Sequence, residues 1–315
     1  MDLLIDIILK AGRSAVELSL FVLLPVMVVM LALMRLLEAW GALDWLVARL
    51  TPWLRPFGLS GLGVFAALQI NFVSFAAPVA TLSMMEQRGV SSRHLAATLA
   101  MVMAMAQANA SFPLAARGLQ LGTVLLLSLL GGLLAAALTY HGFGHHLDSR
   151  EQTQDESLPH PQAETPKGVL DVINRAGAEA FRIALGAMPM LVLSLVAVTA
   201  LTAAGAVAGL TRLLGPLLGQ AGIDPLLILP SLTKYLAGGN AMFAVMDDMR
   251  RQGVVSATLL NASAGWLIHP LDLPGLAVLL SAGKRVAQVW KPAVLGALAG
   301  IALRTLGHVW LSCPM

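Results

Sequence analysis

The sequence predicts an all-α polytopic membrane protein made of two inverted repeats, each with three spanning helices, an interfacial helix and a re-entrant hairpin. Hydropathy and internal repetition are the two observations behind this prediction. Hydrophobic residues make up 57% of the 315 residues, charged residues only 12%, and the mean hydropathy is +0.79. Soluble domains carry about twice that share of charge. Several apolar runs also exceed about 18 residues, the length at which a helix can cross a bilayer.

The chain repeats itself at an offset of 164 residues, where six Gly or Pro positions of the first half meet the same residue in the second. Composition alone would produce about two such matches. Because Gly and Pro set the backbone geometry, their agreement indicates two copies of one fold. We therefore predict a first membrane repeat over residues 1–141, a polar linker over 142–168 and a second membrane repeat over 169–315. The matched pairs are Pro25 and Pro189, Gly41 and Gly205, Pro52 and Pro216, Gly58 and Gly222, Gly89 and Gly253, and Gly132 and Gly296.

Each repeat opens with an apolar run that is long enough to span, over residues 15–37 and 178–204. A shorter segment follows, over 43–57 and 207–220. In the first copy of this segment, Trp45, Arg49 and Trp53 alternate with leucines, a pattern typical of a helix that lies in the membrane interface.

The third segment, over residues 60–85 and 225–249, has a polar centre rich in Gly or Ser. It fits either a re-entrant helical hairpin or a single broken span, and we favour the hairpin. With the hairpin, each repeat crosses the membrane three times, so the two copies insert in opposite orientations. If this segment crosses instead, the repeats are parallel.

The fourth segment, over residues 92–118 and 256–283, is interrupted in both copies. Pro270 and Pro274 cannot both lie inside an unbroken helix, because each removes a backbone donor and clashes with the preceding turn. Unwound backbone at membrane depth persists only where protein or water covers it, which predicts a cavity at this point. An uninterrupted span ends each repeat, over 119–140 and 286–308.

Ionisable and amide side chains in the polar centres are the candidate substrate-binding residues, since such groups are costly at bilayer depth. Lys234 could bind an anionic group of a solute, Asp272 could carry a proton or help to coordinate Na⁺, and His269 could relay protons. In the alternative interpretation, Lys234 and Asp272 form a buried pair that only fixes the packing. The full set of predicted binding residues is Asn71, Asn109, Lys234, Asn240, His269 and Asp272.

Other classes of function find little support in the sequence. The net charge of +3 is small and scattered over short connectors, so we expect contact with lipid headgroups and no nucleic-acid partner. No phosphate-binding loop, dinucleotide fingerprint, zinc-protease motif or nucleophile–base pair is present, so we predict no enzymatic activity, no resident cofactor and no metal site. Uphill transport would then draw on a gradient of H⁺ or Na⁺, or on a partner protein.

Two stretches of the second repeat carry a resemblance to a known family. PSLTKYLAGGNAM ends at Met242, and NASAGWLIHPLDLPG ends at Gly275. They resemble bacterial membrane proteins of the nucleoside-recognition, or Gate-domain, family, which is similar to spore-maturation membrane proteins and distantly to concentrative nucleoside transporters and the ferrous-iron permease. The resemblance covers residues 15–140 and 178–308 and is expected to be strongest in the second repeat. It implies a transport core of hairpin, unwound helix and final helix in the bacterial inner membrane.

One difference from concentrative nucleoside transporters concerns the substrate. In that family a Lys is followed by an Asn-Glu pair, whereas here Asn240 is followed by Ala241. The prediction is therefore a multi-pass transporter or permease for a small polar solute, nucleoside-like and ion-coupled, with a homo-oligomer left open. Two alternatives remain: a cation or metal permease, and a non-transporting membrane scaffold for a partner complex.

Overall fold

The computed structural model describes residues 2–150 and 168–312. Within these ranges the chain is helical and has no strand, and five helices are long and apolar enough to cross a membrane. These candidate spans are Leu4–Ala39, Ser92–Ala115, Leu121–Phe143, Val169–Ala203 and Trp290–Ser312. The all-α polytopic fold class is confirmed. The sixth predicted span, in the fourth segment of the second repeat, is interrupted, and most of the predicted linker lies outside the described residues.

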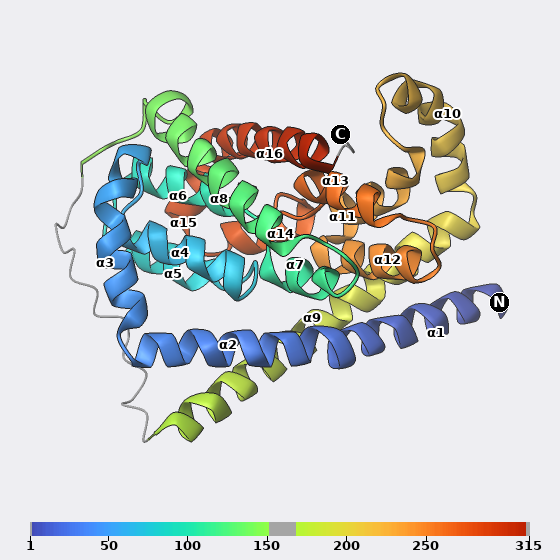
Figure 1. Cartoon of the computed structure of the whole chain (residues 1–315), viewed down its shortest axis with the longest axis horizontal. Helices are drawn as coiled ribbons and strands as arrows, with labels where there is room; N and C mark the ends of the chain where they lie inside the picture. Colours follow the sequence, from blue (N-terminus) through green and yellow to red (C-terminus); the bar gives the residue numbers. More distant parts are fainter. Residues whose placement is uncertain (1, 151–167, 313–315) are drawn as a thin grey trace.

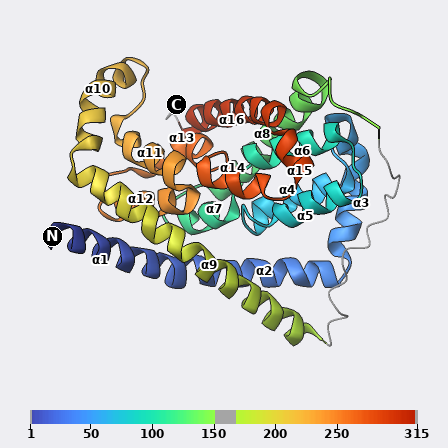
Figure 2. The same cartoon turned by 180° about the vertical axis from the view of Figure 1, so that it is seen from behind.

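Two long helical rods open the two repeats and pack against each other. The first consists of α1 (Asp2–Glu17), the π-helical η1 (Leu18–Leu23) and α2 (Leu24–Ala39), and the second is α9 (Val169–Ala203). Pro25 has no backbone N–H, so one helical hydrogen bond is missing at this position. The π-helical turn just before Pro25 accommodates this gap in the hydrogen-bond pattern. The rods cross while running in opposite directions (Figures 1 and 2), as the inverted arrangement requires, although the symmetry of the repeats stays a prediction.

The matched glycines explain why the same element order occurs twice. In three of the pairs both residues have a positive φ, a conformation that other residues adopt with strain. The first pair turns the chain from the opening rod into the short helices α3 (Ala42–Leu54) and α10 (Ala206–Gln220). The φ values are 69° and 78° for Gly41 and Gly205, 80° and 70° for Gly58 and Gly222, and 69° and 72° for Gly89 and Gly253.

The third segment of each repeat folds into two helices joined by a tight turn. These pairs are α4 (Gly61–Phe72) with α5 (Pro78–Gln87), and α11 (Ile228–Ala237) with α12 (Gly239–Arg251), the latter preceded by the short η4 (Pro225–Leu227). The Thr81 hydroxyl donates a 2.7 Å hydrogen bond to Gln69 Oε1, which brings residues of α5 and α4 side by side. In a straight helix those residues would be about 18 Å apart. This segment is therefore a helical hairpin and not a single broken span. That the hairpin enters and leaves the membrane on one side stays a prediction.

A cross-linking experiment tests the hairpin. With the single cysteine changed (Cys313→Ser), we expect Gln69→Cys with Thr81→Cys to react efficiently with a short thiol-specific cross-linker in native membranes. The control pair, Gln69→Cys with Gln87→Cys, places the second thiol further along α5 and should react poorly. After the chain is cleaved between the two cysteines, a cross-linked protein keeps its fragments joined and so differs in mobility on a gel. Equal cross-linking yields for the two pairs would contradict the hairpin.

The fourth segment is broken in both repeats, as predicted. In the first repeat α6 (Ser92–Ala104) ends, three residues are non-helical, and α7 (Ala108–Ala115) begins. In the second repeat α13 (Ala257–Leu267) and α14 (Leu273–Leu280) are separated by residues 268–272, before the short α15 (Lys284–Gln288). Helix α6 lies at the centre of the molecule, since its residues from 95 to 104 are all buried.

Final helices α8 (Leu121–Leu138, continued by η3, Thr139–Phe143) and α16 (Trp290–Ser312) cross at glycines. A side chain at Gly131 or Gly300 would collide with the backbone carbonyl oxygen of the other, so the two backbones touch. Small residues allow this close approach between membrane helices. The uninterrupted final span predicted for the second repeat is present as α16, and it carries two fully buried ionisable side chains, Arg304 and His308.

Each hairpin is attached to the segment that follows the broken helix of the other repeat. The Glu86 carboxylate, at the end of α5, accepts hydrogen bonds from the backbone N–H groups of Arg285 (3.0 Å) and Val286 (3.2 Å). Arg250, the residue at the matching position in α12, donates to the carbonyl of Arg117 after α7 (3.1 Å from Nε). The repeats are therefore interlocked in one unit.

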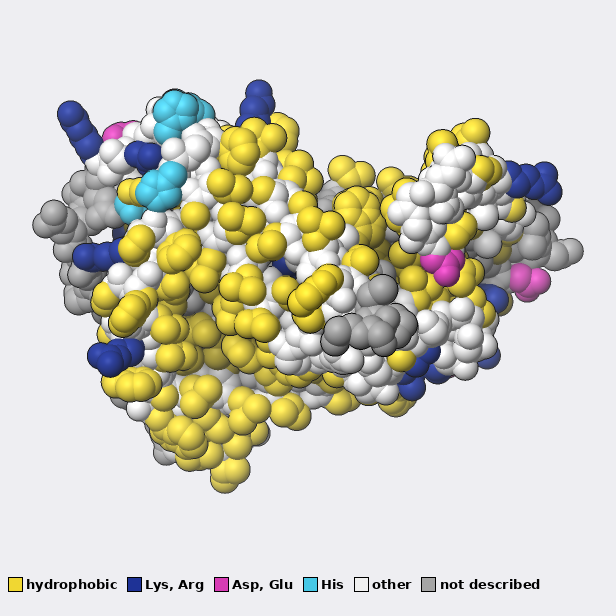
Figure 3. Space-filling view, turned by 45° about the horizontal axis from the view of Figure 1, so that its top comes forward, with side chains coloured by type: hydrophobic (Ala, Val, Ile, Leu, Met, Phe, Trp, Pro, Cys, Tyr) yellow, Lys and Arg dark blue, Asp and Glu magenta, His cyan; other side chains and the backbone are white. Residues whose placement is uncertain are grey.

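The outer surface is predominantly apolar. In Figure 3 hydrophobic side chains cover much of the visible face, and Lys, Arg and His side chains lie mostly toward its margins. Large exposed hydrophobic residues occur on both rods and on the final helices, with Leu193 65%, Leu306 70% and Trp310 77% exposed. A surface of this kind is stable in contact with lipid chains, which agrees with a multi-pass membrane protein.

Candidate functional site

Both helix breaks meet the turn of the second hairpin. A side chain at Gly239 would collide with Nε2 of Gln107, in the break between α6 and α7. A Cβ at the neighbouring Gly238 would lie 3.4 Å from Pro274 and 3.7 Å from Oδ1 of Asp272, at the break between α13 and α14. We call the polar side chains gathered here the polar cluster: Ser74, Gln107, Asn109, Lys234, Asn240, His269 and Asp272.

Lys234 and Asp272 form an ion pair in the polar cluster. The Lys234 ammonium, near the end of α11, donates to Oδ2 of Asp272, and the two side chains are 0% and 2% exposed. Asp272 precedes the first residue of α14, and its Oδ1 accepts a 2.7 Å hydrogen bond from the Gly275 N–H. A carboxylate is favoured there because the first N–H groups of a helix have no partner within the helix. The local sequence thus fixes the carboxylate, and the fold brings the ammonium to it.

Asn109 and Asn240 are also joined directly. Asn109 Nδ2 donates a 2.5 Å hydrogen bond to Asn240 Oδ1, and Asn109 Oδ1 accepts from the backbone N–H of Phe75 at 3.3 Å. Phe75 lies in the turn of the first hairpin, while Asn240 is the second residue of α12 in the second. A single amide of α7 therefore connects the turns of both hairpins.

Asn71, the remaining predicted binding residue, is engaged by the protein itself. Its Nδ2 donates to the Ala67 carbonyl (3.0 Å), and its Oδ1 accepts from the Ser128 hydroxyl (2.7 Å). Ser128 Oγ in turn accepts from the backbone N–H of Ala106 in the first break (2.7 Å). These contacts stabilise the unwound backbone. Ser128 was missed because one serine in an apolar helix gives no signal of its own.

Three buried atoms of the polar cluster have no hydrogen-bond partner: Oγ of Ser74, Nε2 of Gln107 and Nε2 of His269. Buried polar groups in folded proteins are almost always paired. The other ring nitrogen of His269 accepts from the Leu271 N–H at 3.2 Å. The cluster thus has hydrogen-bonding capacity that the protein alone does not use.

Arg304 is a site residue that sequence reasoning missed. It is fully buried in α16 and donates from Nη1 to the carbonyl of Ala104 (2.5 Å) and from Nη2 to that of Ile268 (2.9 Å). These carbonyls stand at the C-terminal ends of α6 and α13, where the two breaks begin. An arginine inside the last apolar run was the available signal, because such a residue is costly in a membrane.

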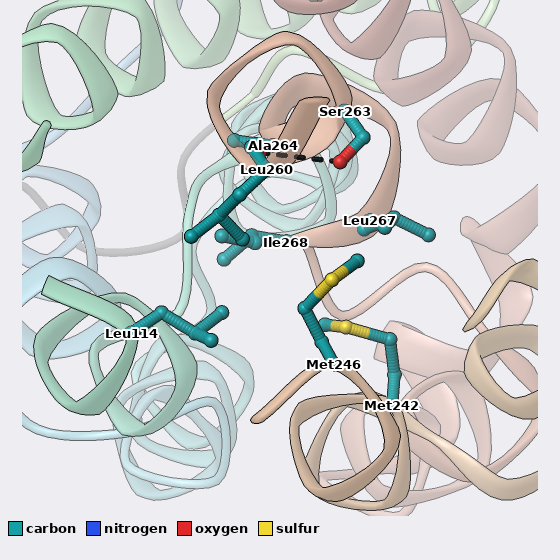
Figure 4. A pocket seen from close by; sticks show the side chains of 8 residues that line it. All are labelled: Leu114, Met242, Met246, Leu260, Ser263, Ala264, Leu267 and Ile268. Carbon is teal, nitrogen blue, oxygen red and sulfur yellow. Dashed lines mark hydrogen bonds between the residues drawn. The ribbon is translucent and has the colours of Figure 1, made fainter. Parts of the chain in front are cut away.

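A narrow pocket with no room for a water molecule lies beside the second break, between α7, α12 and α13. Figure 4 shows its lining, which is apolar apart from Ser263 and includes the side chains of Met242, Met246, Leu260 and Leu267. The hydroxyl of Ser263 is directed to the carbonyl of Leu260, at 3.2 Å. This lining suits no polar solute. The polar cluster itself is closed in this conformation, with every side chain buried except the partly exposed Asn240.

Fold and site together define a multi-pass helical membrane protein in which two hairpins and two broken helices converge on a buried polar cluster, an architecture typical of secondary transporters. A family model described as nucleoside recognition, the Gate domain, matches residues 20–121. This confirms the resemblance, but over the first repeat rather than the second, where the motifs were expected to be strongest. No curated protein matches the sequence.

Solved structures of the concentrative nucleoside transporter CNTnw share the fold. The inward-facing, substrate-bound state matches with a TM-score of 0.69 and 18% identity, over 98% of this chain and 82% of that one. An outward-facing state of a CNTnw double variant matches with a TM-score of 0.69 and 19% identity, over 92% of this chain and 75% of that one. The shared fold thus extends over both repeats.

No group of three or more His, Cys, Asp or Glu residues in the described part of the chain is placed to hold a metal ion.

Proposed function

We propose that this protein is a transporter of the bacterial inner membrane that carries a small polar solute of the nucleoside type. The observation that carries the proposal is the set of unpaired polar atoms on Ser74, Gln107 and His269, buried where the breaks and the hairpin turns converge. A solute rich in hydroxyl groups and ring nitrogens would supply the missing partners. The match to a nucleoside-recognition model and the fold shared with CNTnw support the same solute class.

Binding of such a solute requires the polar cluster to open. The bond between Asn109 and Asn240 and the pair between Lys234 and Asp272 both join the second hairpin to a broken helix. A solute between these elements would exchange the internal bonds for bonds to itself, at small net cost. The proposal therefore assigns the α11–α12 hairpin to gating and Asn109, Lys234, Asn240, His269 and Asp272 to contact with the solute.

Coupling to an ion gradient is the finer part of the proposal. Asp272 is the acidic group of the polar cluster, and protonation would release Lys234 from its partner. The freed ammonium could then bind an electronegative group of the solute, so that proton and solute bind together. Ion coupling of this kind needs no ATP-binding module.

Uptake into proteoliposomes tests the proposal, with a panel of nucleosides, nucleobases, organic anions and divalent metals. We expect saturable nucleoside uptake, and Asn240→Ala should weaken the apparent affinity about tenfold, the effect of losing one hydrogen bond to the solute. The control, Gln252→Ala, removes an exposed amide that bonds only to Asp248 and should change nothing. Uptake of divalent metals alone would instead support the metal permease. If no compound is transported and none stabilises the purified protein, the membrane scaffold becomes the better interpretation.

A further inference from the structure

Arg304 lies between the two helix breaks and binds both. Its guanidinium donates to the carbonyl of Ala104 at the end of α6 and to that of Ile268 at the end of α13. The last carbonyls of a helix lack partners within the helix and carry its partial negative charge. One side chain therefore neutralises the negative ends of both broken helices.

Neighbouring elements leave space for this side chain. A Cβ at Gly131 of α8 would collide with Cγ of Arg304 and lie 2.7 Å from Cδ. A Cβ at Gly265 of α13 would lie 2.5 Å from the Arg304 backbone. Gly131 thus leaves room for the arginine side chain, and Gly265 lets the backbones of α13 and α16 approach closely enough for that side chain to reach both breaks. Packing alone would be satisfied by a smaller apolar residue.

The charge of Arg304 is balanced by carbonyl oxygens and not by an acid. Among the described residues, no carboxylate forms an ion pair with it, and its Nε has no hydrogen-bond partner. Asp272, the nearby acid of the polar cluster, is already paired with Lys234. Burying a cation without a counter-ion is costly, which indicates that the position requires a positive charge.

In transporters built from broken helices, carbonyls of unwound backbone and of half-helix C-termini coordinate the coupling Na⁺. Here the carbonyl oxygens of Ala104 and Ile268, at the ends of two helices that break, are occupied by a guanidinium that belongs to the chain. We propose that Arg304 is a built-in cation that takes the place of an exchangeable Na⁺ between the two broken helices, so that this protein folds and works without Na⁺. The statement that transport needs no Na⁺ rests on the proposed function. The statement that Arg304 occupies the cation position does not depend on that function.

Thermal unfolding of the purified protein tests this inference without any solute. The unfolding midpoint of the native protein should be the same in NaCl and in choline chloride at equal ionic strength. Arg304→Ala should lower the midpoint by several degrees, and Na⁺, but not choline, should then raise it in a saturable manner. Ile301→Ala, a truncation of a buried apolar residue on the same helix, is the matched control and should gain no response to Na⁺.

Each result decides between explanations. Specific stabilisation of the native protein by Na⁺ overturns the inference, as does an Arg304→Ala variant that responds no more than Ile301→Ala. Rescue by millimolar guanidinium without rescue by Na⁺ also overturns it, since Arg304 would then be only a hydrogen-bonding tether. Should Arg304→Ala not accumulate, Arg304→Gln should respond to Na⁺ and Arg304→Lys should not, and the reverse order contradicts the inference. Failure of every solute in the uptake panel would leave these midpoints unaffected, so the two proposals fail separately.

Discussion

Loss of one member of the Lys234–Asp272 pair is expected to have the largest effect of any single substitution in the polar cluster. Lys234→Met leaves the carboxylate of Asp272 buried without its counter-ion, which typically costs about 3–5 kcal/mol of unfolding free energy. Asp272→Asn likewise leaves the buried ammonium of Lys234 without its counter-ion, but asparagine can still accept from the Gly275 N–H and cap α14, so this variant keeps one contact that the aspartate made. Thermal unfolding in detergent measures both effects, and uptake should be abolished in both variants.

The double variant separates a transport role of the pair from a structural one. Lys234→Met with Asp272→Asn removes both charges, so the protein should regain most of the lost stability while uptake stays abolished. If the double variant transports as well as the native protein, the pair serves only packing. The control is the half-exposed Arg35–Glu179 pair between α2 and α9, with side chains 42% and 36% exposed. Its removal should cost at most about 1 kcal/mol and leave uptake unchanged.

Gly131→Leu is expected to disrupt the crossing of α8 and α16. Even a Cβ at this position would collide with Arg304 and lie 2.7 Å from the carbonyl oxygen of Gly300, which belongs to rigid backbone. Overpacking typically costs about 1–3 kcal/mol, and more where backbone must move. We therefore expect a strong fall in the yield of folded protein, measured as the monodisperse fraction after extraction from the membrane.

Gly122 on the same helix provides the control for this prediction. A Cβ there meets nothing within 4 Å, so Gly122→Leu should leave yield and thermal stability unchanged. Similar losses for the two variants would mean that leucine in α8 is harmful wherever it is placed, and would contradict the close crossing as the cause.

Members of the polar cluster were predictable from the sequence where the residue type alone indicates a buried functional position. Lys234, His269 and Asp272 are ionisable groups in apolar surroundings, and such groups are costly enough to signal function without any structure. Asn109 and Asn240 were predictable as polar groups beside Gly and Pro interruptions. Arg304 is also an ionisable residue in apolar surroundings. It was overlooked because the high mean hydropathy of the last apolar run makes that run look like an ordinary span. The engagement of Asn71 by Ser128 could not be predicted, since it joins helices whose relative positions the sequence does not give.

By itself, the sequence determined the class of protein and the interruptions of the helices, and it predicted the duplication. These depend on local properties: apolar length decides which segments can cross a bilayer, and Gly and Pro decide where the backbone turns or breaks. Only the tertiary structure decided which interruptions touch, that Lys234 selects Asp272, and that Arg304 reaches both breaks. Such contacts join residues far apart along the chain, and they depend on how closely the helices approach, which here is governed by glycines at their crossings.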